Sequence, residues 1–179
     1  GYGTIHFAVR PVGSEFSPAH SDSTSAAAGR RNEASPHTGR TAALTITGMK
    51  VLFDADEPIG NPTSATIGNF DGVHMGHKRI LAAVKRSAAG KGVGSCVITF
   101  HPHPQKVLRN IDVPLLLPMR ERLRLLEAEG IDYAACYTFT KEIAAMTAEE
   151  FVNEILVGKL HIRHLIVGPD FSFGKNREG

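Results

Sequence analysis

Apolar and polar positions change their pattern near residue 49 of the chain. Before it, Ser, Thr, Ala and Gly crowd the sequence and no period of 2 or 3.6 is sustained, as in the low-complexity run 21–31. A segment of this kind buries too little apolar surface to offset the entropy of ordering. We therefore expect residues 1–48 to form a disordered extension and residues 49–179 to form the folded domain.

Four apolar runs after residue 49 predict β-strands. They cover 65–70, 95–100, 132–139 and 164–167. The run 95–100 (SCVITF) is almost continuously apolar, which is typical of a strand in a parallel sheet that is covered on both faces. The run 65–70 (ATIGNF) ends in an Asn–Phe–Asp–Gly turn.

Amphipathic stretches between these runs predict three helices. The first covers 76–89 and ends at a cluster of glycines, and the second begins after Pro118 and ends at Gly130. The third follows a capping box at 147–150. We expect these side chains to face the core: Ile80, Leu81, Val84, Ala88, Met119, Leu123, Leu126, Phe151, Ile155 and Leu156. The charged run 120–129 is interpreted as a solvated helix face.

Strands and helices that alternate in this order predict an α/β fold, an open parallel sheet with helices on both faces. In such sheets ligands bind beyond the carboxyl ends of the strands, so the residues that follow each strand become the candidates for chemistry.

Composition narrows the function classes. The chain has 179 residues, about one domain, and a formal net charge of +2, which is too small for a general nucleic-acid or membrane binder. Its apolar runs are far shorter than the ~20 residues that cross a bilayer. Cys96 and Cys136 lie far apart in apolar runs, which indicates buried free thiols in a reducing compartment, the cytoplasm.

The first strand is followed by GNFDGVHMGH, residues 68–77. Its glycines let the backbone turn tightly and approach a ligand closely. His74 and His77 are three positions apart at the start of a helix, where free N–H groups favour anions. The pattern indicates a polyphosphate site. A metal pair completed by other ligands, or a partly buried polar histidine, remains an alternative.

Two other strand ends carry candidate binding residues. In HPHP, residues 101–104, the prolines stiffen the loop, which would suit a wall against a flat ligand. A plain rigid turn, or a metal site from His101 and His103, is the alternative. In GPDFSFG, residues 168–174, an Asp offers an acceptor and two Phe rings offer stacking surfaces, although alternating aromatics after a strand are usually core.

The H-x-G-H pattern resembles the nucleotidyltransferase superfamily of Rossmann-like α/β enzymes. Three ordered segments together resemble the FAD synthetase module of prokaryotic bifunctional riboflavin kinase/FMN adenylyltransferases: GNFDGVHMGH, VITFHPHPQKVL and VGPDFSFGKNREG. The resemblance covers residues 49–179. It implies an enzyme of FAD biosynthesis that makes FAD and pyrophosphate from FMN and ATP.

The resemblance also implies residue roles. The catalytic residues would be His74 and His77, in contact with the triphosphate. The ATP site would comprise Gly68, Asn69, Phe70, Asp71, Gly72, His74 and His77. The flavin site would comprise Phe100, His101, Pro102, His103, Pro104, Asp170, Phe171 and Phe173. Mg²⁺ would be held largely by phosphate oxygens and water, with no protein metal site. Since the second pKa of a phosphate monoester is near ~6, FMN is already a nucleophile at neutral pH.

The sequence departs from the family pattern at its end. Family members continue beyond the FxFG segment with a helix, a strand and a Ser-Ser-Thr-Arg-like loop, and then a riboflavin kinase domain. We therefore expect these 179 residues alone to bind nucleotide weakly and to make little FAD. The alternatives are another H-x-G-H enzyme (a cytidylyltransferase or a pantetheine-phosphate adenylyltransferase), a non-catalytic nucleotide- or flavin-binding fragment, and a metal-binding regulator.

Overall fold

The computed structural model of the protein describes residues 2–6, 43–46, 48–55, 58–169 and 171–175. They fall within one compact unit, and a second unit, Arg10–Arg40, lies outside the described residues. The strands are β1 (Gly3–His6), β2 (Ala43–Ile46), β3 (Met49–Phe53), β4 (Thr63–Ile67), β5 (Gly94–His101), β6 (Tyr133–Thr138) and β7 (Ile162–Val167). The helices are α1 (Met75–Lys91), α2 (Pro104–Arg109), α3 (Met119–Ala128), α4 (Lys141–Ala145) and α5 (Ala148–Glu150), which continues as the π-helix η1 (Phe151–Lys159).

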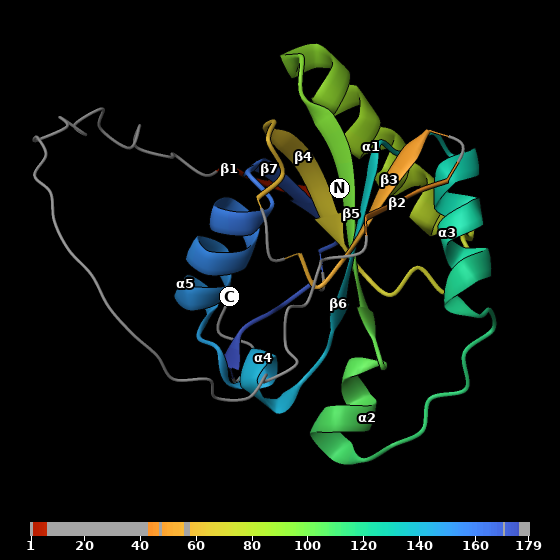
Figure 1. The fold of residues 1–179 in the computed structure, drawn as a ribbon, viewed down its shortest axis with the longest axis vertical. Coiled ribbons are helices and arrows are strands. Elements are labelled where there is room, and N and C mark those ends of the chain that lie inside the picture. The colour runs from red at the N-terminus through yellow and green to blue at the C-terminus, as the bar shows by residue number, and fades with distance from the viewer. Residues whose placement is uncertain (1, 7–42, 47, 56–57, 170, 176–179) are drawn as a thin grey trace, which may run out of the picture. The chain divides into compact units, whose positions relative to one another are not determined.

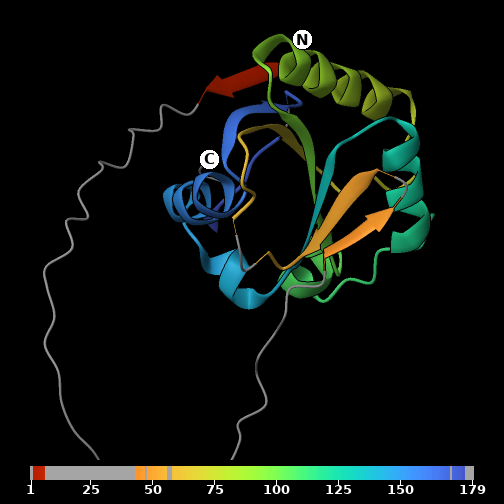
Figure 2. The same cartoon turned by 45° about the horizontal axis from the view of Figure 1, so that its top comes forward.

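The strands form a seven-stranded sheet in the order β1-β7-β4-β5-β6-β3-β2. The five central strands are parallel to their neighbours, and β1 and β2 pair antiparallel at the two edges. Figure 2 shows β1 beside the blue β7 and β2 beside β3 on the other side of the sheet. The predicted open parallel α/β sheet is confirmed.

Both edge strands lie within residues 1–48, where we expected an extension without regular structure. Antiparallel pairing at an edge needs only a short backbone segment, which the composition of the whole region does not reveal. Residues 7–42, the bulk of that predicted extension, lie outside the described residues.

Each face of the sheet packs against its own helices (Figure 1). On β5, Cys96 and Ile98 belong to the cluster under η1, whereas Val97 belongs to the cluster under α1 and α3. This alternation follows from the two-residue period of a strand, and it explains why the run 95–100 is apolar at nearly every position. The predicted helices on both faces are therefore present.

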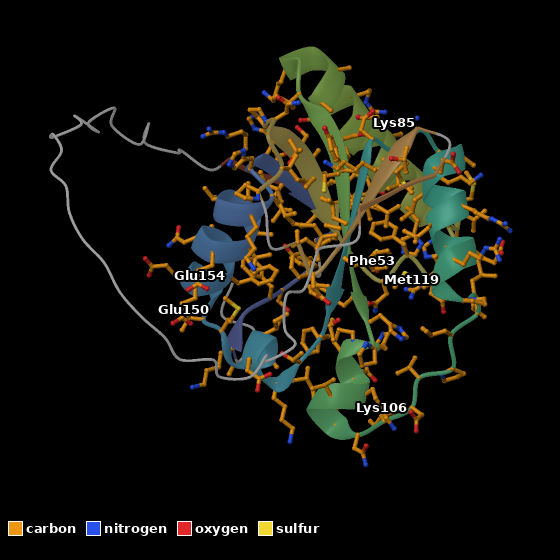
Figure 3. All side chains as sticks on the ribbon, in the orientation of Figure 1. Phe53, Lys85, Lys106, Met119, Glu150 and Glu154 are labelled. Carbon is orange, nitrogen blue, oxygen red and sulfur yellow. The ribbon has the colours of Figure 1, made fainter. Side chains whose placement is uncertain are left out.

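The helix on the η1 face begins as the sequence predicts. Thr147 Oγ1 accepts from the Glu150 N–H, and the Glu150 carboxylate accepts from the Thr147 N–H, which is a capping box. The predicted inward residues Phe151, Ile155 and Leu156 are buried. Figure 3 shows Glu150 and Glu154 on the outer side of this helix, away from the sheet.

The first predicted strand is shifted in the structure. It begins at Thr63 rather than residue 65, because the hydroxyls of Thr63 and Ser64 find partners in the interior, the Leu160 carbonyl at 3.0 Å and the Ser87 hydroxyl at 3.0 Å. It ends at Ile67, and Phe70 has φ 48°, which no strand residue adopts. Helices α2 and α4 are too short for their apolar periodicity to be read from sequence.

We predicted that the charged run of α3 is solvated, and this is wrong for one of its residues. Arg122 is only 2% exposed, since it lies on the same face as Leu123 and Leu126. Met119 of this helix and Phe53 of β3, both labelled in Figure 3, pack against the same cluster.

The two cysteines are free and buried, as predicted. Burial raises the pKa of each thiol to about 12. Both thiols therefore remain protonated at neutral pH.

The sheet order defines where a ligand site is expected. From β4 the chain moves to β5 and β6 on one side, and it later returns to β7 on the other side of β4. A crevice forms beyond the carboxyl end of the strand where this direction reverses. The residues after β4 and β5 lie at that edge.

Candidate active site

His74 and His77, which we call the histidine pair, meet at the start of α1. His74 is the N-cap, and its Nδ1 accepts from the backbone N–H groups of Gly76 at 3.1 Å and His77 at 3.3 Å. A side chain at position 76 would bring its Cβ to 3.0 Å from the His74 ring, so the ring would have to shift by a few tenths of an ångström, and glycine avoids this. Met75 turns outward and is 68% exposed.

The two imidazoles stack on each other, with ring centroids 3.8 Å apart and planes inclined by 22°. His77 also contacts the buried ring of Phe70, at 4.8 Å between centroids. Burial and the neighbouring His74 lower the pKa of His77, against the Gly72 backbone and the Asp71 carboxylate, which favour the protonated ring. His77 is thus held neutral at pH 7.

This cap differs from the anion site that the sequence predicted in one respect. We expected free N–H groups in the first turn of α1, but two of them donate to His74. The exposed His74 ring therefore covers part of the helix end. An incoming anion would meet imidazole edges there as well as backbone.

The turn between β4 and α1 is fixed by side chains from other elements. The Asn69 carbonyl accepts from Arg122 Nη1 at 2.7 Å and from Thr99 Oγ1 at 3.3 Å. The Asp71 carboxylate accepts from the backbone N–H groups of Leu116 at 2.7 Å and Leu117 at 2.9 Å.

These contacts decide the charge of Asp71. Slight burial would raise its pKa, but the two N–H bonds, together with Arg122 and His103, outweigh burial and lower it. Gly72 completes the turn at φ 65°, a left-handed conformation that glycine adopts without strain.

A cavity of about 790 Å³ opens beyond the ends of β4 and β5. It is bounded by strand ends, by α2 and α4, and by the segment after β7, and we call it the aromatic pocket because five phenylalanines line it. Its lining residues are Ile67, Gly68, Asn69, Phe100, His103, Pro104, Gln105, Leu108, Arg109, Phe139, Ile143, Ala144, Phe151, Phe171, Ser172, Phe173 and Gly174.

His103 and Pro104 enter this pocket as the start of a helix rather than as a plain loop. Pro104 occupies the first turn of α2, where its missing N–H has no cost, and His103 is the N-cap whose Nδ1 accepts from the Gln105 N–H at 3.2 Å. His103 Nε2 lies 2.7 Å from the Asn69 side-chain amide. Asn69 therefore links the pocket to the turn that carries the histidine pair.

The aromatic pocket brings part of both predicted sets together. The pocket includes Gly68 and Asn69 from the ATP set and Phe100, His103, Pro104, Phe171 and Phe173 from the flavin set. His101 and Pro102 do not line it, because His101 ends β5 and is exposed. Asp170 lies outside the described residues. The Phe70 side chain is 2% exposed and fills the core beneath His77, so it supports the turn from within.

Several lining residues escaped the sequence reasoning. Phe139 directly follows β6, so the rule that strand ends carry function would have found it. Phe151 appeared only as a core residue, and the lining residues Gln105, Leu108 and Arg109 belong to the unpredicted α2. Within the described residues, no group of three or more His, Cys, Asp or Glu side chains is placed to hold a metal ion.

With this geometry in hand, comparison with known proteins is decisive. The sequence matches the FAD synthetase family over residues 56–179. The chain belongs to the FAD synthetase family.

Relatives in this family are bifunctional enzymes by name. The bifunctional riboflavin kinase/FMN adenylyltransferase of Pseudomonas fluorescens is 43% identical over 115 residues, which are 64% of this chain and 37% of that protein. The protein of the same name from Escherichia coli K12 is 40% identical over 115 residues, with the same two shares. The chain thus spans 37% of the length of each of these FAD synthetase relatives.

A solved structure has a similar fold. The crystal structure described as a macrolide-efflux protein from Streptococcus pneumoniae matches with a TM-score of 0.62 and 25% identity, over 72% of this chain and 44% of that one. In the part of this chain that the structure describes, no helix is long and apolar enough to cross a bilayer.

Proposed function

We propose that the chain carries the FMN adenylyltransferase activity of a bifunctional riboflavin kinase/FMN adenylyltransferase. An oxygen of the FMN phosphate attacks the α-phosphorus of ATP. The bond from that phosphorus to the bridging oxygen of the β-phosphate breaks, and FAD and pyrophosphate leave. Family membership supports this reaction. The observation that carries it to this chain is a stacked histidine pair that the 68–72 turn connects to the aromatic pocket.

In the proposed complex, the triphosphate lies against the histidine pair and the 68–72 turn. Imidazole N–H groups donate to phosphate oxygens, and the negative charge of the phosphates raises the pKa of His77 from its lowered value. The enzyme needs no separate nucleophile, because the substrate phosphate is already ionised. Its contribution is alignment and neutralisation of the charge that develops on pyrophosphate.

The isoalloxazine ring of FMN would occupy the aromatic pocket. A cavity of about 790 Å³ lined by five phenylalanines suits a flat, largely apolar ring system. Five residues of the flavin set support this assignment because they line the pocket: Phe100, His103, Pro104, Phe171 and Phe173. We keep His101, Pro102 and Asp170 in the proposal as neighbours of this site.

We propose that Mg²⁺ binds together with ATP. The described residues offer no cluster of carboxylates to hold it, and Asp71 already accepts two backbone bonds. Phosphate oxygens and water would hold the ion, which neutralises phosphate charge. The proposed setting is the cytoplasm, with ATP and FMN as the small-molecule substrates.

The test is FAD and pyrophosphate formation from FMN and ATP in the complete protein, including any residues that flank these 179. We expect His74→Ala and His77→Ala each to lower kcat by about 100-fold, as loss of a preorganised donor does. FMN affinity should not change. Wild-type rates in the double variant would overturn the assignment of the pair, and absence of FAD with the unaltered protein would overturn the function.

A further inference from the structure

Among the residues that the structure describes, Arg122 is the one buried cation, and the proposed reaction does not yet use it. It is 2% exposed on the inner face of α3, and Nη1 donates to the Asn69 carbonyl at 2.7 Å. Within the described residues, its Nε and Nη2 atoms are buried and have no hydrogen-bond partner. None of the ion pairs among those residues includes it.

A guanidinium in this position costs folding free energy. Its charge is removed from water without an ion pair, the Asp71 carboxylate acts on it only through space, and two of its donor nitrogens are left unsatisfied. An apolar side chain of similar length would fill the same space without that cost. The hydrogen bond to the Asn69 carbonyl is therefore the contact through which Arg122 can serve the site.

The contact fixes a peptide plane. The only cis peptide bond in the described residues is His101–Pro102, so the bond from Asn69 to Phe70 is trans, and its carbonyl oxygen and N–H point in opposite directions. Arg122 draws the Asn69 oxygen toward α3, and the Phe70 N–H consequently points away from it. Thr99 assists, at a longer 3.3 Å.

The residue that follows this plane has an unfavourable backbone conformation. Phe70 has φ 48°, which a bulky residue rarely adopts and which must be held by its surroundings. The Phe70 ring is clamped in the core beneath His77. Arg122 holds the other side of the same peptide through the Asn69 carbonyl.

We propose that Arg122 is a positioning residue for adenylyl transfer, which turns the Phe70 N–H toward the triphosphate by holding the Asn69 carbonyl. The inference rests on the proposed function and deepens it. Arg122 touches neither substrate, and its effect reaches ATP through the peptide between Asn69 and Phe70.

The experiment compares Arg122→Met and Arg122→Lys with the unaltered complete protein. For Arg122→Met we expect kcat to fall by about tenfold, a smaller loss than removal of a direct donor, with FMN affinity unchanged. The urea midpoint should stay the same or rise, because a buried unpaired charge is gone. Arg122→Lys should recover part of kcat, since it keeps the charge and one donor.

Arg124→Met is the matched control, because Arg124 lies on the same helix but is exposed and pairs with Glu121 at its surface. It should leave kcat unchanged. A purely structural role for Arg122 would lower stability, FMN binding and kcat together, and that result overturns the proposal. Unchanged kcat in Arg122→Met also overturns it.

The two proposals fail in different ways. If the unaltered protein makes FAD and Arg122→Met makes it equally fast, only the role of Arg122 is wrong. If the unaltered protein makes no FAD, the proposed function is wrong. The role of Arg122 is then tested by comparing the ATP affinity of Arg122→Met with that of the unaltered protein. Weaker ATP binding by Arg122→Met then supports its role, whereas equal binding, or no binding by either protein, overturns it.

Discussion

The histidine pair and the aromatic pocket are neighbours, yet they are built by different means. The pair is made by four consecutive residues, His74 to His77, and is held by backbone N–H groups of its own helix end. The pocket is assembled from strand ends, two short helices and the segment after β7. We therefore expect the histidine pair to be sensitive to charge and pH, and the aromatic pocket to be sensitive to the packing of its side chains.

This difference implies that the two halves can be damaged separately. A change in the pair alters local polarity and leaves the core intact. A change in the pocket, where Phe151 is both a lining residue and part of the core, affects folding as well as binding. Asn69, in contact with His103, is the point where the halves meet.

The largest expected effect separates packing from binding within the pocket. Phe151→Ala should lower the free energy of unfolding by about 3–5 kcal/mol, because Phe151 is 5% exposed and its removal leaves a cavity. Urea unfolding measures this. Phe173→Ala, at a half-buried position, is the matched variant: we expect about tenfold weaker FMN binding with a much smaller loss of stability. Equal weakening of ATP binding by Phe173→Ala would show that the halves are not separable.

The next effect concerns proton uptake by the pair. Because burial and His74 lower the pKa of His77 and bound phosphate would raise it, ATP binding near neutral pH should take up protons. Calorimetry in buffers of different ionisation enthalpy measures the uptake, which His77→Gln should abolish. His161→Asn is the control, since His161 has φ 46°, which asparagine tolerates. Uptake that persists in His77→Gln would assign the proton to another group.

The lowered pKa of His77 also gives a stability profile without ligand. Above pH about 6.5, the ordinary histidine value, the ring is neutral in both the folded and the unfolded chain. Below it, the unfolded chain binds the proton first, so the free energy of unfolding falls with pH until the folded ring also protonates. His77→Gln should remove this part of the profile.

The smallest expected effect concerns Asp71, which ties the turn beside the pair to the backbone at 116–117. Asp71→Asn should cost about 1 kcal/mol at neutral pH, because the amide offers one acceptor oxygen to two N–H groups. Since the folded pKa of Asp71 lies below 3.8, the unaltered protein loses this contribution as pH falls through that pKa, and the variant should not. Asp112→Asn is the control for an exposed carboxylate. An equal loss in both variants would contradict the special role of Asp71.

Local spacing made the histidine pair predictable from sequence. Capping, the close approach of the His74 ring to Gly76 and the stacking of residues three apart all act within one turn of helix. Four of the five central strands, β4 to β7, and the three main helices were predictable for the same reason, since their periodicity is local, whereas β3 was not predicted. Arg122 could have been placed inside by its spacing from Met119 and Leu126, but its charge outweighed that signal in the sequence interpretation.

The pocket was predictable only in part. Phe100 lies at the carboxyl end of β5 and Phe173 follows β7, so the strand-end rule located them. Phe151 reaches the pocket because β7 returns beside β4, and this sheet order depends on packing over the whole domain. The edge strands β1 and β2 were missed because their pairing depends on partners more than on their own residues.

The two inert thiols have a practical consequence. Since Cys96 and Cys136 are the only cysteines of the chain and both are buried and protonated, thiol-specific dyes should not react with the folded protein. A single cysteine introduced at Met75, 68% exposed between the two histidines, would then be the sole labelling site. If ATP binds as proposed, a fluorophore there would report its arrival directly, without removal of any native residue from the interior.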